Sequence, residues 1–135
     1  MISINEDVYV YGGRGEVRSS NVLWRYNIGT QEYTQESRHG ADFFSPQPTS
    51  YHVCFEYQET LLTFLGINDY LGNPTAVNMW NFENKQWSIF DVNMDGRSRV
   101  VADLIGTDIV YIGGDKWNIH TTGNVNAVYL NDRNY

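Results

Sequence analysis

The sequence predicts an all-β protein built from repeated antiparallel sheets. Along most of its 135 residues, apolar and aromatic side chains alternate with a period of two, and short clusters of Gly, Asn, Asp and Pro interrupt the alternation. No segment has the periodicity of a convincing helix. The chain also repeats itself, because the run Asp7–Gly13, which ends in two glycines, returns in altered form at Thr60–Gly66 and Thr107–Gly114.

Two further positions follow each glycine pair at a nearly fixed distance. The first comes 13 or 14 residues after the second glycine and holds Tyr26, Trp80 or Val128. The second comes seven residues later and holds Tyr33, Trp87 or Tyr135, so successive repeats lie 54 and 48 residues apart. A period of this length indicates that each repeat is one structural unit. We expect a single domain over residues 1–135, with units at approximately 1–45, 46–95 and 96–135.

The alternation divides the chain into ten predicted strands, three in the first unit, four in the second and three in the third. In chain order they are Val8–Gly12, Val22–Asn27, Glu32–Gln35, Tyr51–Tyr57, Leu61–Leu65, Ala76–Phe82, Gln86–Phe90, Val100–Ile105, Ile109–Ile112 and Ala127–Leu130. Each is a short run of alternating apolar residues bounded by turn-forming residues, which is typical of antiparallel strands.

The connections between these strands are of two kinds. Tight turns at 27–30, 58–60, 83–85, 106–108 and 131–134 join strands within a unit, and most of them contain Gly or Asn, which accept the positive φ that a hairpin needs. Longer segments follow the glycine pairs, at 14–21, 67–75 and 115–126, and join the units, at 36–49 and 93–97. Long loops on a regular sheet scaffold are where binding usually occurs.

The glycine pair and the two spaced aromatic positions resemble the kelch repeat, which forms one blade of a β-propeller. The motif residues that carry the resemblance are Gly12, Gly13, Tyr26, Tyr33, Gly66, Trp80, Trp87, Gly113, Gly114 and Tyr135. The sequence departs from the pattern at Leu65 and Val128, although the spacing is kept. The resemblance implies antiparallel four-stranded blades in a partial ring of about three, with glycines that let a neighbouring backbone approach closely. Substitution of Gly13 or Gly114 is expected to affect stability more than binding.

A partial ring leaves sheet edges and an apolar face without a neighbour. With four strands to a blade, ten strands supply the second to fourth strands of one blade, all four of the next, and the first three of a third. Propellers hide their edges by closing the ring, and repeat units cannot bury such a face alone. We therefore expect self-association over a stable monomer, with two copies arranged head to tail completing the propeller.

Composition excludes several classes of partner. Nine Lys and Arg residues against 16 Asp and Glu give a net charge of −7, which opposes attraction to nucleic acid or to anionic membranes. No stretch approaches the roughly 20 apolar residues of a membrane span, and the first residues lack the pattern of a signal peptide. The single cysteine, Cys54, lies in an alternating run where a packed thiol is favoured. We expect an intracellular, cytoplasmic protein.

The sequence offers no pattern for catalysis, a metal or a cofactor. The histidines His39, His52 and His120 fall in different units without ligand spacing. The glycine-rich segment 12–17 is followed by no helix pattern, so a turn explains it better than a phosphate-binding loop. Scattered acidic residues, such as Asp95 before Gly96, indicate turns rather than a calcium loop. We expect no catalytic residues, no cofactor and no metal site, and no enzyme activity.

What remains is a binding surface on the long loops. The candidate binding residues combine guanidinium, amide and aromatic groups of the kind that dominates interfaces: Arg14, Arg18, Ser19, Asn68, Tyr70, Lys116, Trp117 and His120. The resemblance implies a protein–protein interaction module that holds a partner segment through its blade loops. Trp117 and Arg14 are the expected main contacts, because both lie on loops just past a glycine pair. The alternatives are a fragment of a galactose-oxidase-like or carbohydrate-binding propeller, and a truncated structural remnant.

Overall fold

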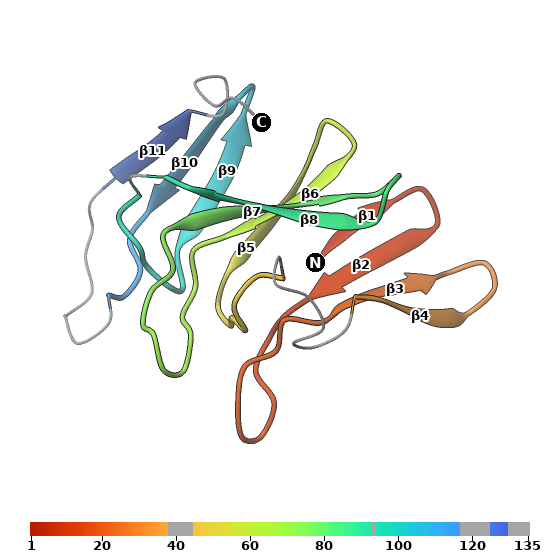
Figure 1. The fold of residues 1–135 in the computed structure, drawn as a ribbon. Helices are drawn as coiled ribbons and strands as arrows, with labels where there is room; N and C mark the ends of the chain where they lie inside the picture. The colour runs from red at the N-terminus through yellow and green to blue at the C-terminus, as the bar shows by residue number, and fades with distance from the viewer. Residues whose placement is uncertain (38–44, 93, 117–124, 130–135) are drawn as a thin grey trace.

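Eleven β-strands and no helix occupy the part of the chain that the computed structural model describes, residues 1–37, 45–92, 94–116 and 125–129 (Figure 1). All pairings between neighbouring strands are antiparallel. The prediction of an all-β protein made of antiparallel sheets is therefore confirmed. None of the described residues forms a helix that could cross a membrane.

The first sheet has four strands in sequence order: β1 (Ile2–Ile4), β2 (Asp7–Tyr11), β3 (Leu23–Asn27) and β4 (Glu32–Ser37). The prediction of ten strands, with three in the first unit, was wrong because it missed β1. This three-residue strand pairs with β2 across a two-residue turn, in which Asn5 adopts a φ of 54°. Asparagine tolerates this left-handed conformation, so the turn closes a hairpin that begins the first sheet.

The middle sheet repeats the same four-strand order, and the third sheet has three described strands. The middle sheet contains β5 (Val53–Tyr57), β6 (Thr60–Phe64), β7 (Ala76–Asn81) and β8 (Gln86–Asp91). The third sheet contains β9 (Val101–Ile105), β10 (Asp108–Ile112) and β11 (Val125–Tyr129), with β10 in the centre. These bounds lie within a few residues of the predicted ones.

Antiparallel order places the two kinds of connection at opposite ends of the strands. The tight turns β1–β2, β3–β4, β5–β6 and β7–β8 all lie at one end, here called the turn end. The loops that follow the first two glycine pairs, and the described parts of the linkers that join one sheet to the next, lie at the opposite end, here called the loop end (Figure 1). The fold therefore gathers its long segments on one side.

Side chains from facing sheets form two separate cores. At the first junction, Tyr11 and Leu23 of the first sheet pack with Leu61, Trp80 and Trp87 of the middle sheet. At the second junction, the opposite face of the middle sheet, including Leu62, Phe64, Val77 and Met79, packs on Ile109 and Tyr111 of the third sheet. All five residues of β6 are buried, because this strand is covered on both faces (Figure 1).

Leu65 shows how the repeat tolerates the loss of a glycine. Its φ of 61° is close to the values at the equivalent positions Gly12 and Gly113, 68° and 75°. A left-handed backbone costs a residue with a side chain about 1 to 2 kcal/mol. The Leu65 side chain is almost fully buried in the second core, and burial of a leucine contributes about 1.5 to 3 kcal/mol. The gain from burial offsets the strain, so the backbone geometry is kept.

Candidate functional site

The loop end is organised by two linkers of related sequence. Thr49-Ser50-Tyr51 enters the middle sheet and 97–99, Arg-Ser-Arg, enters the third. The N–H of Gly13 donates to the carbonyl of Thr49 at 3.0 Å, and the N–H of Gly66 donates to the carbonyl of Arg97 at 2.7 Å. The last residue of each linker, Tyr51 or Arg99, has a φ of 55°. The two linkers thus hold neighbouring glycine loops in equivalent positions.

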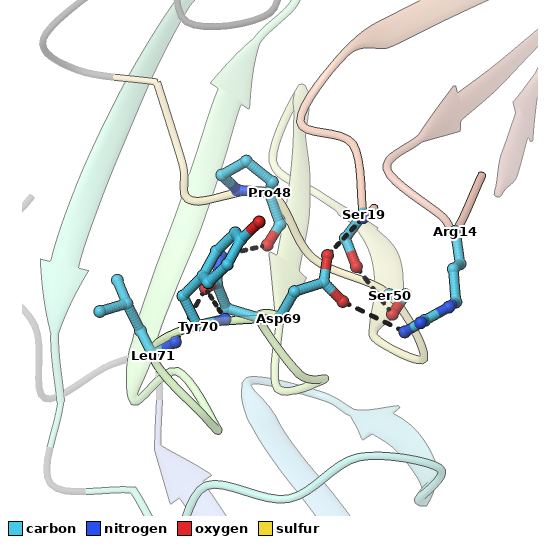
Figure 2. A network of polar contacts seen from close by, with 8 residues as sticks. Arg14, Ser19, Pro48, Ser50, Asp69, Tyr70 and Leu71 are labelled. Carbon is cyan, nitrogen blue, oxygen red and sulfur yellow. Dashed lines mark hydrogen bonds and ion pairs between the residues drawn. The ribbon is translucent and has the colours of Figure 1, made fainter. Parts of the chain in front are cut away.

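Asp69 joins the glycine loops of the first and middle sheets (Figure 2). Its Oδ1 accepts from Arg14 Nη1 at 3.1 Å, and its Oδ2 accepts from the backbone N–H of Ser19 at 2.6 Å. The Ser19 hydroxyl in turn bonds the Ser50 hydroxyl at 3.1 Å. Charge-assisted bonds of this kind are stronger than neutral ones, so one carboxylate fixes the spacing of two loops that are 50 residues apart in sequence.

The loop that carries Asp69 is shaped by the buried side chain of Asn68. The Asn68 Oδ1 accepts from the N–H groups of Tyr70 and Leu71, both at 2.9 Å, and its Nδ2 donates to the Pro48 carbonyl at 2.7 Å. This pattern is an Asx turn, which asparagine forms with the backbone that follows it. The turn leaves Tyr70 84% exposed and Leu71 also exposed at the tip. Two apolar side chains are therefore presented to solvent on a loop that is held in place (Figure 2).

A hollow of about 560 Å³ lies beside this tip, between the linker that enters the middle sheet and strands β7 and β8. Its wall is mostly amide and hydroxyl side chains, with one carboxylate and a few apolar groups: Ser45, Gln47, Thr49, Leu71, Asn73, Pro74, Thr75, Ala76, Asn78, Ile89 and Asp91. Amides can both donate and accept hydrogen bonds. The lining therefore suits a peptide segment, whose backbone would contact the amides and whose apolar side chain would contact the apolar groups.

A second hollow, of about 520 Å³, lies at the turn end and has different chemistry. Four carboxylates line it, those of Asp7, Glu56, Glu59 and Glu83, over the rings of Tyr9 and Phe82. The Tyr9 and Phe82 ring centroids are 4.7 Å apart. The two hollows thus differ in chemistry, because the one at the loop end is rich in amide and hydroxyl groups with a single carboxylate and the one at the turn end has four carboxylates.

Lys116 belongs to a charge network around the buried side chain of Arg97. Arg97 Nη2 and Lys116 Nζ both lie 2.8 Å from the Asp95 carboxylate, and Arg97 Nη1 donates to the Gly113 carbonyl at 3.1 Å. Burial works to raise the pKa of Asp95, but the hydrogen bonds from Lys116 and Arg97 prevail and lower it. The network ties the linker to the third sheet, so Lys116 serves the packing of the protein.

His52 and Cys54 are two partly buried titratable groups at the first junction. The His52 ring packs edge-on against Tyr11, with ring centroids 5.2 Å apart. Burial lowers the pKa of His52 to about 4 and raises the pKa of the Cys54 thiol. His52 Nδ1 has no hydrogen-bond partner among the described residues. Both groups are neutral at pH 7, which fits a packed interior.

The structure separates the predicted binding residues into three groups. Arg14, Arg18 and Tyr70 are exposed at the loop end, whereas Ser19 and Asn68 are buried and shape the loops. Lys116 is ion-paired, as described above. Trp117 and His120 lie outside the described residues, as do His39 and the motif residue Tyr135.

Sequence reasoning did not find Asp69 or Leu71. The run Asn-Asp-Tyr-Leu-Gly at 68–72 did carry the signal for an Asx turn. Among the residues that the structure describes, no group of three His, Cys, Asp or Glu side chains lies close enough to hold a metal ion.

Comparisons with known proteins agree with this architecture. A family profile for the kelch motif matches residues 1–38, which span the first sheet. The chain is also similar to protein tag-53 of Caenorhabditis elegans, with 20% identity over 134 residues. This alignment covers 87% of the chain, which spans about a tenth of the length of that relative. Residues 1–38 therefore carry a kelch motif, and the antiparallel four-stranded sheets are consistent with kelch blades.

Proposed function

We propose that this chain is a non-catalytic interaction module that binds an extended segment of a partner protein at the loop end. The observation that carries the proposal is the pair of bonds that Asp69 accepts from Arg14 and Ser19. These bonds hold two loops together beside a hollow, where Tyr70 and Leu71 are exposed. Exposed aromatic and aliphatic groups on a fixed frame are the usual anchors of protein interfaces. The kelch motif at residues 1–38 supports the same function. We also propose a cytoplasmic setting, supported by the single, unpaired Cys54.

The lining of the loop-end hollow suggests what kind of segment it would hold. The amides of Gln47 and Asn78 can pair with the N–H and C=O groups of an extended backbone. Ile89 and Leu71 offer apolar contact for a side chain, and Asp91 favours a basic residue nearby. Trp117, which lies outside the described residues, remains a predicted contact, and its truncation to alanine is expected to weaken binding by about 2 kcal/mol.

Selection from a displayed library of random peptides tests the proposal without a known partner. Enriched peptides are measured for binding to the protein and to a double variant, Tyr70→Ala with Leu71→Ala. Because both side chains are exposed, the double variant is expected to fold normally while its affinity falls by about 10-fold or more. Ile28→Ala, an equally simple truncation of an exposed apolar residue at the turn end, is the matched control and should leave binding unchanged.

Two outcomes would contradict the proposal. One is a library that yields no peptide bound better by the wild type than by the double variant. The other is a set of peptides that lose affinity when Glu56 or Glu83 is changed, because these line the acidic hollow of the turn end.

A further inference from the structure

None of the residues that the structure describes packs on the two outer faces of the molecule. On the first sheet, the pairs Val8↔Tyr26, Tyr26↔Tyr33 and Val10↔Trp24 lie on the face that points away from the middle sheet. The rings of Tyr26 and Tyr33 contact each other at a tilt of 40°, with centroids 4.6 Å apart, yet Tyr33 is 73% exposed. On the third sheet, the corresponding outer face exposes Val101, Ile105 and Ile112. Both faces thus expose several large apolar side chains side by side, which in soluble proteins marks a surface that another surface covers.

These two open faces are opposite sides of the repeated sheet: one carries the two spaced aromatic positions of the repeat and the other does not. We name the face that carries the two spaced aromatic positions the front face, and the reverse side the back face. At the first junction, the front face of the middle sheet, with Trp80 and Trp87, packs on the back face of the first sheet. At the second, the front face of the third sheet, with Ile109 and Tyr111, packs on the back face of the middle sheet. The faces left open are one front and one back.

We propose that the open back face of the third sheet packs on the open front face of the first sheet in a second copy of this chain, head to tail. The contact would repeat, between copies, the front-to-back pairing that the chain makes twice internally. It goes beyond the proposed binding of a partner segment, because it uses the outer faces of the sheets and leaves the loop end free. A front-to-back contact joins two different surfaces, so it closes into a ring or continues as a filament.

Positions that are exposed here are buried where the chain makes the same contact internally. Tyr33 on the open front face occupies the repeat position of Trp87, which is only 8% exposed at the first junction. Ile105, on the open back face, is 61% exposed. Its counterpart Tyr57, which like Ile105 ends a strand before a two-residue turn, is 9% exposed. A neighbouring copy would bury Tyr33 and Ile105, as Trp87 and Tyr57 are buried within the chain.

Polar groups on the two open faces are also complementary. The back face of the third sheet carries two carboxylates, that of Asp108 across from Ile105 and the exposed one of Asp103 across from Val110. Phe55 holds the position of Asp103 in the middle sheet. The front face of the first sheet carries no charged residue at its paired positions, but Trp24, Tyr26 and Tyr33 offer ring N–H and hydroxyl donors. A carboxylate that becomes buried needs such donors. A second copy supplies both the apolar cover and the donors for Asp103.

Sedimentation equilibrium with two charge variants tests the proposal. The wild type is expected to sediment above the 15.6 kDa mass of one chain as its concentration rises. Tyr33→Asp blocks the front face and Ile105→Asp blocks the back face, and each alone should weaken association by at least about 30-fold, because it buries an unpaired carboxylate. Val17→Asp, at an exposed loop position away from both faces, should associate like the wild type. Urea unfolding checks that all variants fold cooperatively.

Mixing the two single variants gives the decisive result. Tyr33→Asp keeps an intact back face and Ile105→Asp keeps an intact front face. An equimolar mixture should therefore form a species of two chains and no larger one. A mixture that stays monomeric while the wild type associates would overturn the head-to-tail arrangement. A wild type that remains at the mass of one chain at every concentration would overturn the second copy as the occupant and leave the faces to another protein segment.

Discussion

The two internal junctions share one backbone arrangement but are filled by different chemistry. At equivalent linker positions the first junction has Thr49 and the second has Arg97, and three residues further on the first has His52 and the second has Val100. Both linkers accept a hydrogen bond from the glycine loop of the sheet before them. The first junction is therefore aromatic and contains a titratable ring, whereas the second is more aliphatic and contains a buried guanidinium.

This difference teaches that the repeat specifies backbone positions more strictly than side chains. The Ser at the centre of each linker is buried and bridges to the residue after the glycine pair in both cases, Ser50 to Ile67 and Ser98 to Asp115. The residues on either side of this serine differ between the two linkers, because each buried side chain there has its own hydrogen-bond or packing partners. We expect the stability of one junction to depend on pH and that of the other on the buried side chain of Arg97.

Replacement of Arg97 by alanine should have the largest effect. It removes a fully buried side chain, which leaves a cavity and takes the Arg97 donor from the Gly113 carbonyl, so the two effects together should cost about 4 kcal/mol in unfolding free energy. Thr49→Ala, at the equivalent position, removes a local side-chain bond to the Gln47 carbonyl and should cost about 1 kcal/mol. Urea unfolding of both variants gives the values. If Arg97→Ala lost no more unfolding free energy than Thr49→Ala, the second junction would not depend on Arg97.

A pair of glycine substitutions separates backbone strain from steric overlap. A Cβ at Gly114 would lie 2.5 Å from the Ser98 carbonyl oxygen, and the φ there is +87°. We expect Gly114→Ala to cost about 3 kcal/mol, since strain and overpacking add. At Gly13 the φ is +95° but no atom lies within 4 Å of the added Cβ, so Gly13→Ala should cost only about 1 kcal/mol. Thermal unfolding compares the two, and a larger loss at Gly13 would contradict the geometry.

The smallest effect is the acid sensitivity of the first junction. Because burial lowers the pKa of His52 from 6.5 to about 4, its contribution to stability is complete above pH 6.5 and is lost as the pH falls towards 4. At pH 5 the loss is about 2 kcal/mol. The unfolding free energy of His52→Gln should therefore fall less between pH 7 and pH 5 than that of the wild type. Parallel slopes would show that the ring is not kept neutral by burial.

Local signals in the sequence sufficed for most of the fold. The strands from β2 onwards are marked by alternation and by turn residues, and both signals act over a few neighbours. β1 was missed because three residues are too short to show a period, although Asn5 marked the turn that follows it. The missed strand changes the description of the first unit, since its sheet has four strands rather than three.

The candidate site was less accessible to sequence reasoning, because its geometry depends on contacts between distant residues. Arg14 was identified by its place after a glycine pair, but its partner Asp69 lies 55 residues away and no local pattern links them. Ser19 and Asn68 were chosen for their polar groups, and the structure buries both. Burial depends on which loop packs against which, and that follows only from the arrangement of whole sheets.

The hydrogen bonds at the loop end also fix how neighbouring sheets are spaced there. The backbone N–H of Gly13 donates to the Thr49 carbonyl, and that of Gly66 donates to the Arg97 carbonyl. The described contacts between the first and middle sheets further along the strands include side-chain pairs, such as the rings of Tyr9 and Phe82 and the ion pair of Lys85 with Glu36. A partner segment bound at the loop end would therefore rest where backbone hydrogen bonds set the distance from one sheet to the next.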